Sequence, residues 1–230
     1  MPNFICIDSA TNVCSVTLVV NDKVVCSRES HEDRNHASLL TPFIDQCFKE
    51  SQTDIKKYDF VCINKGPGSY TGLRIGTAAA KALAYSGNLK LIAIDSLRIL
   101  FYALKQKHPN LFQNQVLFFP MLDARRMEVY TCVFDQNGNR IHSIDATIMD
   151  INSFNNRLKS AEKAVFFGNG ASKYKTTIKD ERLVYIDQIH SSSLFMAQIV
   201  LDSIKNNTLL FEDFVYFEPL YLKEFAQKKA

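Results

Sequence analysis

At residues 65–76 the chain reads Lys65-Gly66-Pro67-Gly68-Ser69-Tyr70-Thr71-Gly72-Leu73-Arg74-Ile75-Gly76. The apolar, β-branched run Phe60-Val61-Cys62-Ile63 precedes it and predicts a buried strand. An alanine-rich run from Thr77 to Ser86 follows and predicts a helix. Glycine and proline favour backbone conformations that other residues avoid, so the segment between strand and helix is predicted to form a tight turn.

This glycine loop has two interpretations. Backbone N–H groups at the start of the following helix would favour an anion; alternatively, the glycines serve close packing. The loop is not a Walker A loop, because no Gly-Lys-Ser/Thr closes it, and it lacks Gly-x-Gly-x-x-Gly. We expect a Cβ to be costly at Gly68 and Gly72, and Gly72→Val to destabilise the fold by roughly 1–3 kcal/mol if φ there is positive. The residues that we assign to this structural loop are Gly66, Pro67, Gly68, Thr71, Gly72 and Arg74.

Length and composition indicate a globular protein. The 230 residues suffice for two small domains or one large one, and 47% of them are hydrophobic, which supports a substantial core. The sequence has no run of about 18 apolar residues and no signal-peptide pattern at its start, so we expect a cytoplasmic protein without a membrane span. The net charge is +3, but no basic run with interleaved aromatic residues indicates direct RNA binding.

The six cysteines indicate reduced thiols. They stand at positions 6, 14, 26, 47, 62 and 132, mostly within apolar segments, and none forms a Cys-x-x-Cys pair. Disulfides persist mainly in oxidising compartments, and structural zinc sites need closely spaced ligands. We therefore expect buried, unpaired thiols rather than a disulfide framework or a zinc site.

The two halves of the chain show the same order of predicted elements. In the first half we expect strands at 3–9, 13–20, 23–30, 59–63 and 89–94, and helices at 37–50, 73–86 and 96–107. In the second half we expect strands at 115–122, 128–134, 140–148, 164–167 and 183–186, and helices at 151–160, after Gly168-Asn169-Gly170, and at 192–204. The unit β-β-β-α-β-α thus occurs twice, which predicts an α/β fold with helices outside mixed sheets. The predicted domains are 1–107 and 108–230.

Several motifs, in the same order, carry a family resemblance. Besides the glycine loop they are Ile5-Cys6-Ile7-Asp8-Ser9-Ala10-Thr11, His36 with Leu39-Leu40-Thr41-Pro42-Phe43-Ile44-Asp45, Leu122-Asp123-Ala124-Arg125-Arg126-Met127-Glu128-Val129-Tyr130, and Glu218-Pro219-Leu220-Tyr221-Leu222. Together they resemble the TsaB (YeaZ) family, small partner proteins in bacterial synthesis of threonylcarbamoyladenosine on tRNA. The stretch from about 140 to 210 adds little to the resemblance.

The resemblance implies both a fold and a role. The fold is the duplicated, ribonuclease H-like actin/Hsp70/sugar-kinase (ASKHA) fold, in which a nucleotide binds between the halves. The implied role is a non-catalytic scaffold or activator without a cofactor, which binds TsaD directly. TsaD transfers the threonylcarbamoyl group to the adenosine next to the anticodon, and TsaE, an ATPase, joins the pair. A homodimer is expected when TsaD is absent, and tRNA is reached only through the complex.

Each candidate catalytic residue has a structural alternative. Asp8 stands where the ASKHA fold places an acidic residue near phosphate and metal, but the sequence lacks the glycine of Asp-x-Gly-Thr, so we expect a turn-capping role. His31 and His36 are five residues apart, not the four that places two ligands on one helix face, so we expect solvated or capping histidines. For Asp123-Ala124-Arg125-Arg126 we expect a structural ion pair or a place in the wall of a cleft.

The resemblance also indicates that a metal site is missing. TsaD holds its metal with a His-x-x-x-His motif after the strand that follows the glycine-loop helix. Here Ser96 and Leu100 stand at the corresponding positions, and leucine cannot bind a metal. The chain is therefore expected to be a catalytically silent paralogue, and the peptidase M22 glycoprotease label attached to such proteins has no support in these residues.

Two helices carry more apolar surface than one sheet requires. The helix at 37–50 has an apolar stripe wider than the roughly 100° of one core face, and the helix at 73–86 has small residues that permit close helix approach. One interpretation is that both helices merely cover one sheet, but the resemblance implies that they form a helical bundle with TsaD. The predicted partner-binding residues are Leu39, Leu40, Phe43, Ile44, Cys47, Ile75, Gly76, Ala79, Ala82 and Leu83.

Two other functions remain as alternatives. The first is an enzyme, either an ASKHA-type ATPase or a metallopeptidase, which retained metal or ATP turnover by the isolated chain would indicate. The second is a free-standing homodimer with an unrelated binding role. Mixing with TsaD distinguishes the second alternative, because only a TsaD partner would exchange its homodimer for the heterodimer.

Overall fold

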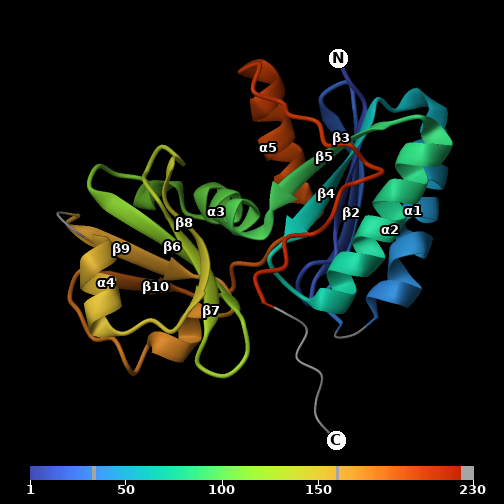
Figure 1. Cartoon of the computed structure of the whole chain (residues 1–230). Coiled ribbons are helices and arrows are strands. Elements are labelled where there is room, and N and C mark those ends of the chain that lie inside the picture. Colours follow the sequence, from blue (N-terminus) through green and yellow to red (C-terminus); the bar gives the residue numbers. More distant parts are fainter. Residues whose placement is uncertain (33–34, 159–160, 224–230) are drawn as a thin grey trace, which may run out of the picture. The chain divides into compact units, whose positions relative to one another are not determined.

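The computed structural model describes residues 1–32, 35–158 and 161–223. They form two compact units: the first comprises Met1–Ile99 with Ser191–Tyr221, and the second comprises Leu100–His190 with Leu222 and Lys223. Each unit is built around one five-stranded sheet (Figure 1). Within the described residues, no helix is both long and apolar enough to cross a membrane.

The first sheet has the strand order β3-β2-β1-β4-β5. Its strands are β1 (Phe4–Asp8), β2 (Cys14–Val20), β3 (Lys23–Ser30), β4 (Phe60–Gly66) and β5 (Lys90–Asp95). β1 pairs with β2, and β2 with β3, in antiparallel register, whereas β4 runs parallel to both β1 and β5. Asn21 and Asp22 adopt positive φ in the turn between β2 and β3, as the predicted hairpin requires.

Alternation along the strands gives the first sheet two buried faces. Ile5 and Ile7 lie in an apolar core with residues of α1 (His36–Ser51) and α2 (Tyr70–Gly87). The opposite face carries Ser15 and Thr17, whose hydroxyls hydrogen-bond to Ser193 of α5 (Ser193–Lys205). In Figure 1, α1 and α2 accordingly lie on one side of this sheet and α5 on the other.

The segment after α5 runs back along the first unit. Glu212 donates its backbone N–H to Leu91 O of β5 at 2.8 Å, and Leu220 donates to Lys65 O at 2.7 Å. Between them, Phe217 is buried in the core under α2. At Glu212 the segment thus pairs with the edge strand β5, which would otherwise leave Leu91 O unpaired.

The second unit repeats this arrangement. Its strands are β6 (Val116–Asp123), β7 (Val129–Phe134), β8 (Arg140–Thr147), β9 (Lys163–Phe167) and β10 (Leu183–Ile186). The strand order is β10-β9-β6-β7-β8, which is the order of the first sheet in reverse listing, with the same parallel and antiparallel pairs. The predicted duplicated α/β fold is thereby confirmed.

Helices cover the second sheet on both faces. α4 (Ile151–Leu158) contributes Phe154 to a core with Phe119 and Phe166, whereas Phe101 contacts Phe118 and Phe134 on the other face. Phe101 belongs to α3 (Ser96–Lys107), within which the boundary of the two units falls. Short 3₁₀ turns occur at η1 (Ile55–Lys57), η2 (Pro109–Leu111) and η3 (Ala171–Tyr174).

Two details differ from the sequence-based expectation. The helix expected after Gly168-Asn169-Gly170 is only the 3₁₀ turn η3, which ends where Tyr174 is pinned by hydrogen bonds to Met127 O and Met149 N. The last two residues of the helix expected at 151–160 lie outside the described residues.

The helix at 192–204 packs with the first unit although we placed it in the domain 108–230, because its buried face contacts β1 and β2. The two halves of the sequence thus correspond to the two copies of the duplicated fold. The compact units differ from these halves, because most of α3 belongs to the second unit and α5 belongs to the first.

Candidate functional site

The glycine loop packs tightly against the turn that follows β1. A Cβ at Gly68 would lie 2.0 Å from Ala10 O, and a Cβ at Gly72 would lie 2.0 Å from Ser9 O. Positive φ occurs at Gly66 (+98°) and at neither of the other two. Our expectation that a Cβ is costly at Gly68 and Gly72 is supported, but the reason is close backbone approach and not positive φ.

Hydrogen bonds fix the same contact. Ser69 N donates to Ala10 O at 2.6 Å, and the Ser69 hydroxyl caps α2 by accepting from Gly72 N at 3.3 Å. The Ser9 hydroxyl donates to Gly72 O at 2.8 Å. Arg74 and Thr71 of the loop set are exposed, and the guanidinium of Arg74 lies 4.3 Å from the Tyr70 ring centre. Close packing therefore accounts for the glycines without an anion.

A buried polar network lies at the carboxyl end of β1. Asp8 is fully buried, and its carboxylate accepts hydrogen bonds from Ala10 N at 3.1 Å, from Asn64 Nδ2 at 2.8 Å and from the Ser191 hydroxyl. The bond to Ala10 N is the expected turn-capping bond. The other two bonds join β1 to β4 and to the segment that leads into α5.

Asn64 extends this network to α3 and the glycine loop. Its Oδ1 accepts from Gly66 N at 3.0 Å and from the Ser96 hydroxyl at 2.7 Å. The Ser96 oxygen also lies 2.7 Å from Pro67 O. Asn64 and Ser191 escaped sequence reasoning, because neither belongs to a motif with a recognisable spacing; only the fold brings Ser191 to Asp8.

Burial raises the pKa of the Asp8 carboxyl above its ordinary value, although the hydrogen bonds from Ser191, Ala10 and Asn64 oppose the shift. Desolvation is the larger effect because the charged carboxylate loses its water. The folded state therefore binds this proton more tightly than the unfolded state. Protonated Asp8 stabilises the fold at low pH, and that contribution is lost as the pH rises through its raised pKa.

We expect Asp8→Asn to remove this pH dependence. The oxygen of the new amide can still accept from Ala10 N and Asn64 Nδ2, and its NH₂ group can donate to the Ser191 hydroxyl. Measured by urea unfolding between about pH 4 and about pH 8, the stability of the variant relative to the wild type should rise with pH, starting from the ordinary carboxyl range. A difference that stays constant across that range would contradict this account of Asp8.

The residues present do not fit a metal ion. Both Asp8 oxygens and the Ser96 hydroxyl already have protein partners, and Leu100 is fully buried in apolar surroundings. Among the described residues, no three His, Cys, Asp or Glu side chains form a group that could hold a metal.

The two histidines considered from the sequence lie in different surroundings. His31 Nε2 lies 2.7 Å from Glu29, whereas His36 is buried at the start of α1. His31 is thus solvated as expected, and His36 is instead a core residue.

Asp123 takes part in a structural ion pair in the second unit. Its carboxylate lies 2.5 Å from Lys173 Nζ, which also donates to Glu128 O at 3.0 Å. Arg125 and Arg126 adopt positive φ in the same turn. These contacts agree with the structural role that we expected for this motif.

Only some of the predicted partner-binding residues on α1 and α2 lie at the surface. Leu40, Ile44 and Cys47 have buried side chains, and Gly76 is a buried glycine, so none of the four presents a surface to a partner, and the prediction is corrected for them. Leu40, Ile44 and Cys47 lie on the inner face of α1, and Gly76 lies on α2 against Ser9 and Ile63. Partly buried residues of the set are Leu39, Phe43, Ile75, Ala79 and Leu83; Ala82 is exposed.

The outer face of α2 carries small and aromatic residues. Ala78 and Ala82 are exposed one turn apart, and Tyr85, a further turn on, is 80% exposed. Small side chains let another helix approach closely, and exposed tyrosine is a frequent anchor of protein interfaces. This face, Ala78 with Ala82 and Tyr85, is the outer α2 face.

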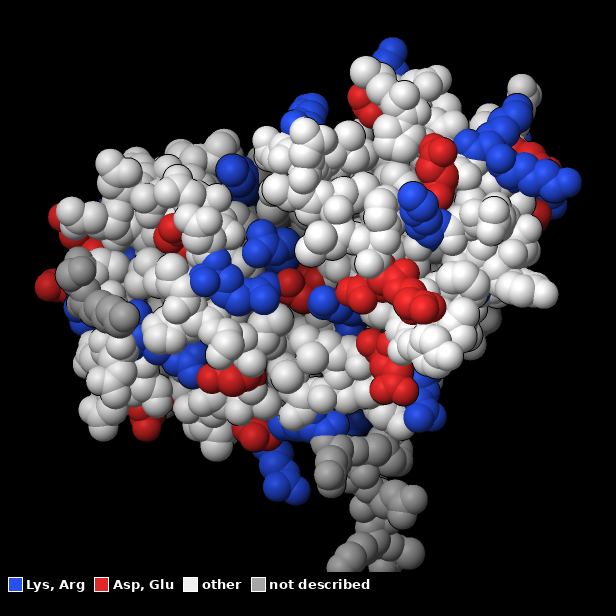
Figure 2. Space-filling view, turned by 45° about the horizontal axis from the view of Figure 1, so that its top comes forward, with Lys and Arg blue, Asp and Glu red and all other residues white. Residues whose placement is uncertain are grey.

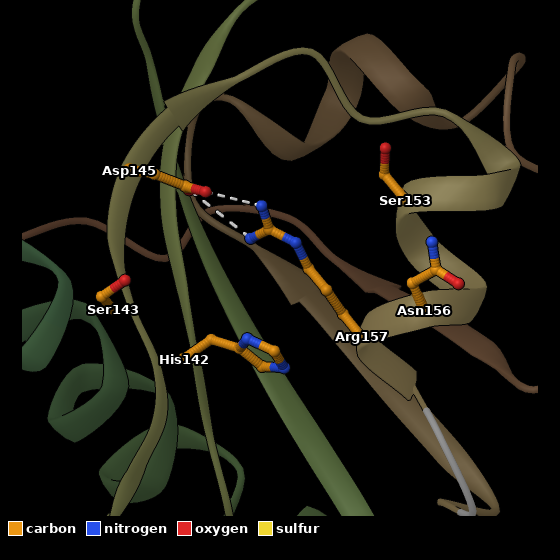
Figure 3. A pocket seen from close by; sticks show the side chains of 6 residues that line it. All are labelled: His142, Ser143, Asp145, Ser153, Asn156 and Arg157. Atoms are coloured by element: carbon orange, nitrogen blue, oxygen red, sulfur yellow. Dashed lines mark hydrogen bonds and ion pairs between the residues drawn. The ribbon is translucent and has the colours of Figure 1, made fainter.

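The second unit also holds a polar pocket of about 250 Å³ between β8 and α4 (Figure 3). Arg157 reaches from α4 to Asp145 of β8, and Arg157 Nη2 lies 2.6 Å from the carboxylate. The other residues lining it are His142, Ser143, Ser153 and Asn156. No residue of the predicted site set lines this pocket, and the ion pair neutralises its two charges.

Fold and network together define the class of protein. The two five-stranded units share one strand order, and the first has an acidic residue at the end of β1 and a glycine loop after β4. These features agree with the ASKHA fold that the resemblance implied. The chain belongs to the family described as TsaD, tRNA N6-adenosine threonylcarbamoyltransferase, whose family model matches residues 24–196.

Within this family the chain is clearly similar to TsaB proteins. It is 29% identical over 177 residues to the tRNA threonylcarbamoyladenosine biosynthesis protein TsaB of Bacillus subtilis, which covers 76% of this chain and 74% of the relative. It is 32% identical over 124 residues to TsaB of Haemophilus influenzae, covering 54% of this chain and 50% of the relative. The fold matches YeaZ from Pseudomonas aeruginosa with a TM-score of 0.81 at 18% identity, over 96% of this chain and all of that one.

Proposed function

We propose that this chain is a non-catalytic subunit in the synthesis of threonylcarbamoyladenosine on tRNA. It binds a TsaD-type transferase directly, with a TsaE-type ATPase joining the pair, and it forms a homodimer when the transferase is absent. The chain acts in the cytoplasm as a scaffold or activator. It has no cofactor and reaches the adenosine next to the anticodon only through the complex. The names of its TsaB relatives support the pathway.

One observation carries the non-catalytic assignment. The Asp8 carboxylate, which would face phosphate and metal in a catalytic ASKHA protein, is turned to protein donors on both oxygens. Ser96 is likewise occupied by Asn64 and Pro67. A catalytic site keeps polar groups available for the substrate. Here these groups hold the fold together instead.

The surface supports partner binding more than tRNA binding. The outer α2 face combines two small alanines with an exposed tyrosine, which suits the helix of another protein. On the face drawn in Figure 2, lysine and arginine are interspersed with aspartate and glutamate. Nucleic-acid interfaces are instead strongly positive over a continuous patch. We accordingly assign the tRNA contact to the partner.

The test is reconstitution with the TsaD-type and TsaE-type proteins of the same organism. We expect the chain to form a complex with the TsaD-type protein in size-exclusion chromatography and to dissolve its own homodimer on mixing. In a reaction supplied with threonylcarbamoyl-adenylate and unmodified tRNA, mass spectrometry of the digested nucleosides should show product only when the chain is present. The isolated chain should turn over neither ATP nor peptides above background.

Two outcomes would favour the alternatives. ATP turnover by the isolated chain that disappears in Asp8→Ala would identify an ASKHA-type ATPase. A homodimer that persists beside the TsaD-type protein, with unchanged product formation, would indicate an unrelated binding role.

A further inference from the structure

Two cysteines from different elements contact each other between β3 and α1. Cys26 lies on β3 and Cys47 on α1, and their Sγ atoms are 2.7 Å apart. A disulfide bond is about 2.05 Å long, so the sulfurs are unbonded but would need to approach by less than about 1 Å. Both side chains belong to the same apolar core.

The position of Cys26 makes this pair reachable from solvent. β3 is the edge strand of the first sheet, and Cys26 is 6% exposed, whereas Cys47 is fully buried. Glu50 Oε2 lies 3.5 Å from Cys26 Sγ, and Glu50 in turn pairs with Arg28. This exposed ion pair, with side chains 39% and 49% accessible, lies beside the thiol.

The remaining cysteines provide an internal comparison. Cys6 and Cys62 stand opposite each other on the parallel strands β1 and β4, but both are fully buried in the middle of the sheet. Cys14 is 1% exposed, and Cys132 is fully buried in the second unit. An oxidant that acts on the folded chain therefore reaches Cys26 first.

We propose that Cys26 and Cys47 form a redox-active dithiol, which hydrogen peroxide closes to a disulfide between β3 and α1. The Cys26 sulfur attacks one peroxide oxygen, the O–O bond breaks, and Cys26 sulfenic acid and water form. The Cys47 sulfur then attacks the sulfenic sulfur; the S–S bond forms as the S–O bond breaks, and a second water leaves. Two thiols thus lose two electrons and two protons, which reduce one peroxide to two waters. A small dithiol reverses the reaction by exchange.

The reaction is slow by the standard of exposed thiols. Burial raises the pKa of both Cys26 and Cys47, and the nearby carboxylate of Glu50 acts in the same direction. The thiolate is the reacting species. We therefore expect the Cys26–Cys47 disulfide to accumulate only during prolonged exposure to hydrogen peroxide, and the experiment must last correspondingly long.

The test is peptide mapping of the folded full-length chain after exposure to hydrogen peroxide. After removal of peroxide by catalase, denaturation and treatment with N-ethylmaleimide should label four of the six cysteines. Trypsin should release residues 24–28 joined to residues 35–49, and dithiothreitol should separate them. The cross-link should raise Tm by roughly 5–10 °C, because it restricts the unfolded chain.

Variants make the assignment specific. Cys26→Ser and Cys47→Ser should keep all five remaining cysteines open to N-ethylmaleimide and show no peroxide-dependent rise in Tm. Cys132→Ala, in the second unit, should still give the linked peptides. If a serine variant does not fold, Cys26→Ala replaces it, and the map of the wild type decides in any case. Six labelled thiols after exposure, a link between other cysteines, or sulfinic acid at Cys26 without a link would each overturn the proposal. The proposal does not depend on the proposed function.

Discussion

Ala82→Glu should leave the chain folded and weaken its binding to the TsaD-type partner by 100-fold or more. Ala82 is exposed on the outer α2 face, so a carboxylate there is solvated in the free protein. In a helical bundle the same carboxylate would be buried without a counter-charge, which costs about 3–5 kcal/mol of binding. The homodimer should be lost as well, because the proposal assigns both assemblies to the same helices.

The measurement is titration calorimetry with the TsaD-type protein, next to size-exclusion chromatography of the chain alone. Ala82→Ser is the matched control, since it changes the polarity of the same position without adding charge or much volume, and it should bind nearly as the wild type does. The melting temperature reports the fold of both variants. If Ala82→Glu melts like the wild type and still binds with wild-type affinity, the outer α2 face is not the joint, and the scaffold proposal loses its contact surface.

Gly72→Ala should destabilise the fold by about 3 kcal/mol or more. The added Cβ would lie 2.0 Å from Ser9 O, and backbone atoms occupy that space, so a change of side-chain rotamer cannot relieve the clash. Either α2 or the turn after β1 must shift, and the shift would disturb the hydrogen bond from Ser9 Oγ to Gly72 O. Alanine is otherwise the better helix former, so intrinsic helix propensity acts in the opposite direction.

Urea unfolding at neutral pH measures this effect. Thr71→Ala, at the exposed neighbouring position, should change the free energy of unfolding by no more than about 0.5 kcal/mol. Should Gly72→Ala prove as stable as the wild type, the loop has room that its packing against Ser9 does not suggest.

The local elements were accessible from the sequence because short-range patterns determine them. β-Branched runs predicted the strands, and Asn21-Asp22 predicted the turn of the first hairpin. The resemblance likewise predicted the ASKHA fold. A pattern of residues specifies which elements form, whereas contacts over long sequence separations depend on how those elements assemble.

The errors follow from that distinction. The apolar stripe on α1 indicates a surface wide enough for a partner, but Leu40, Ile44 and Cys47 pack in the core of their own unit. A glycine in a tight turn suggests positive φ at Gly72, because the sequence does not reveal that Ser9 O approaches the helix. Ser191 carries no motif at all, and only the return of the chain to the first sheet places its hydroxyl on Asp8.

During synthesis on the ribosome, all strands of the first sheet have been made once Asp95 is added. The residues that cover the second face of that sheet are made much later. Ser191, α5 and Phe217, which cover that sheet and its edge, follow only after nearly all of the second unit. At typical elongation rates the delay is on the order of 10 s. During that interval the nascent chain exposes apolar strands that are buried in the finished protein. The first unit therefore begins to emerge first, but its core is completed last.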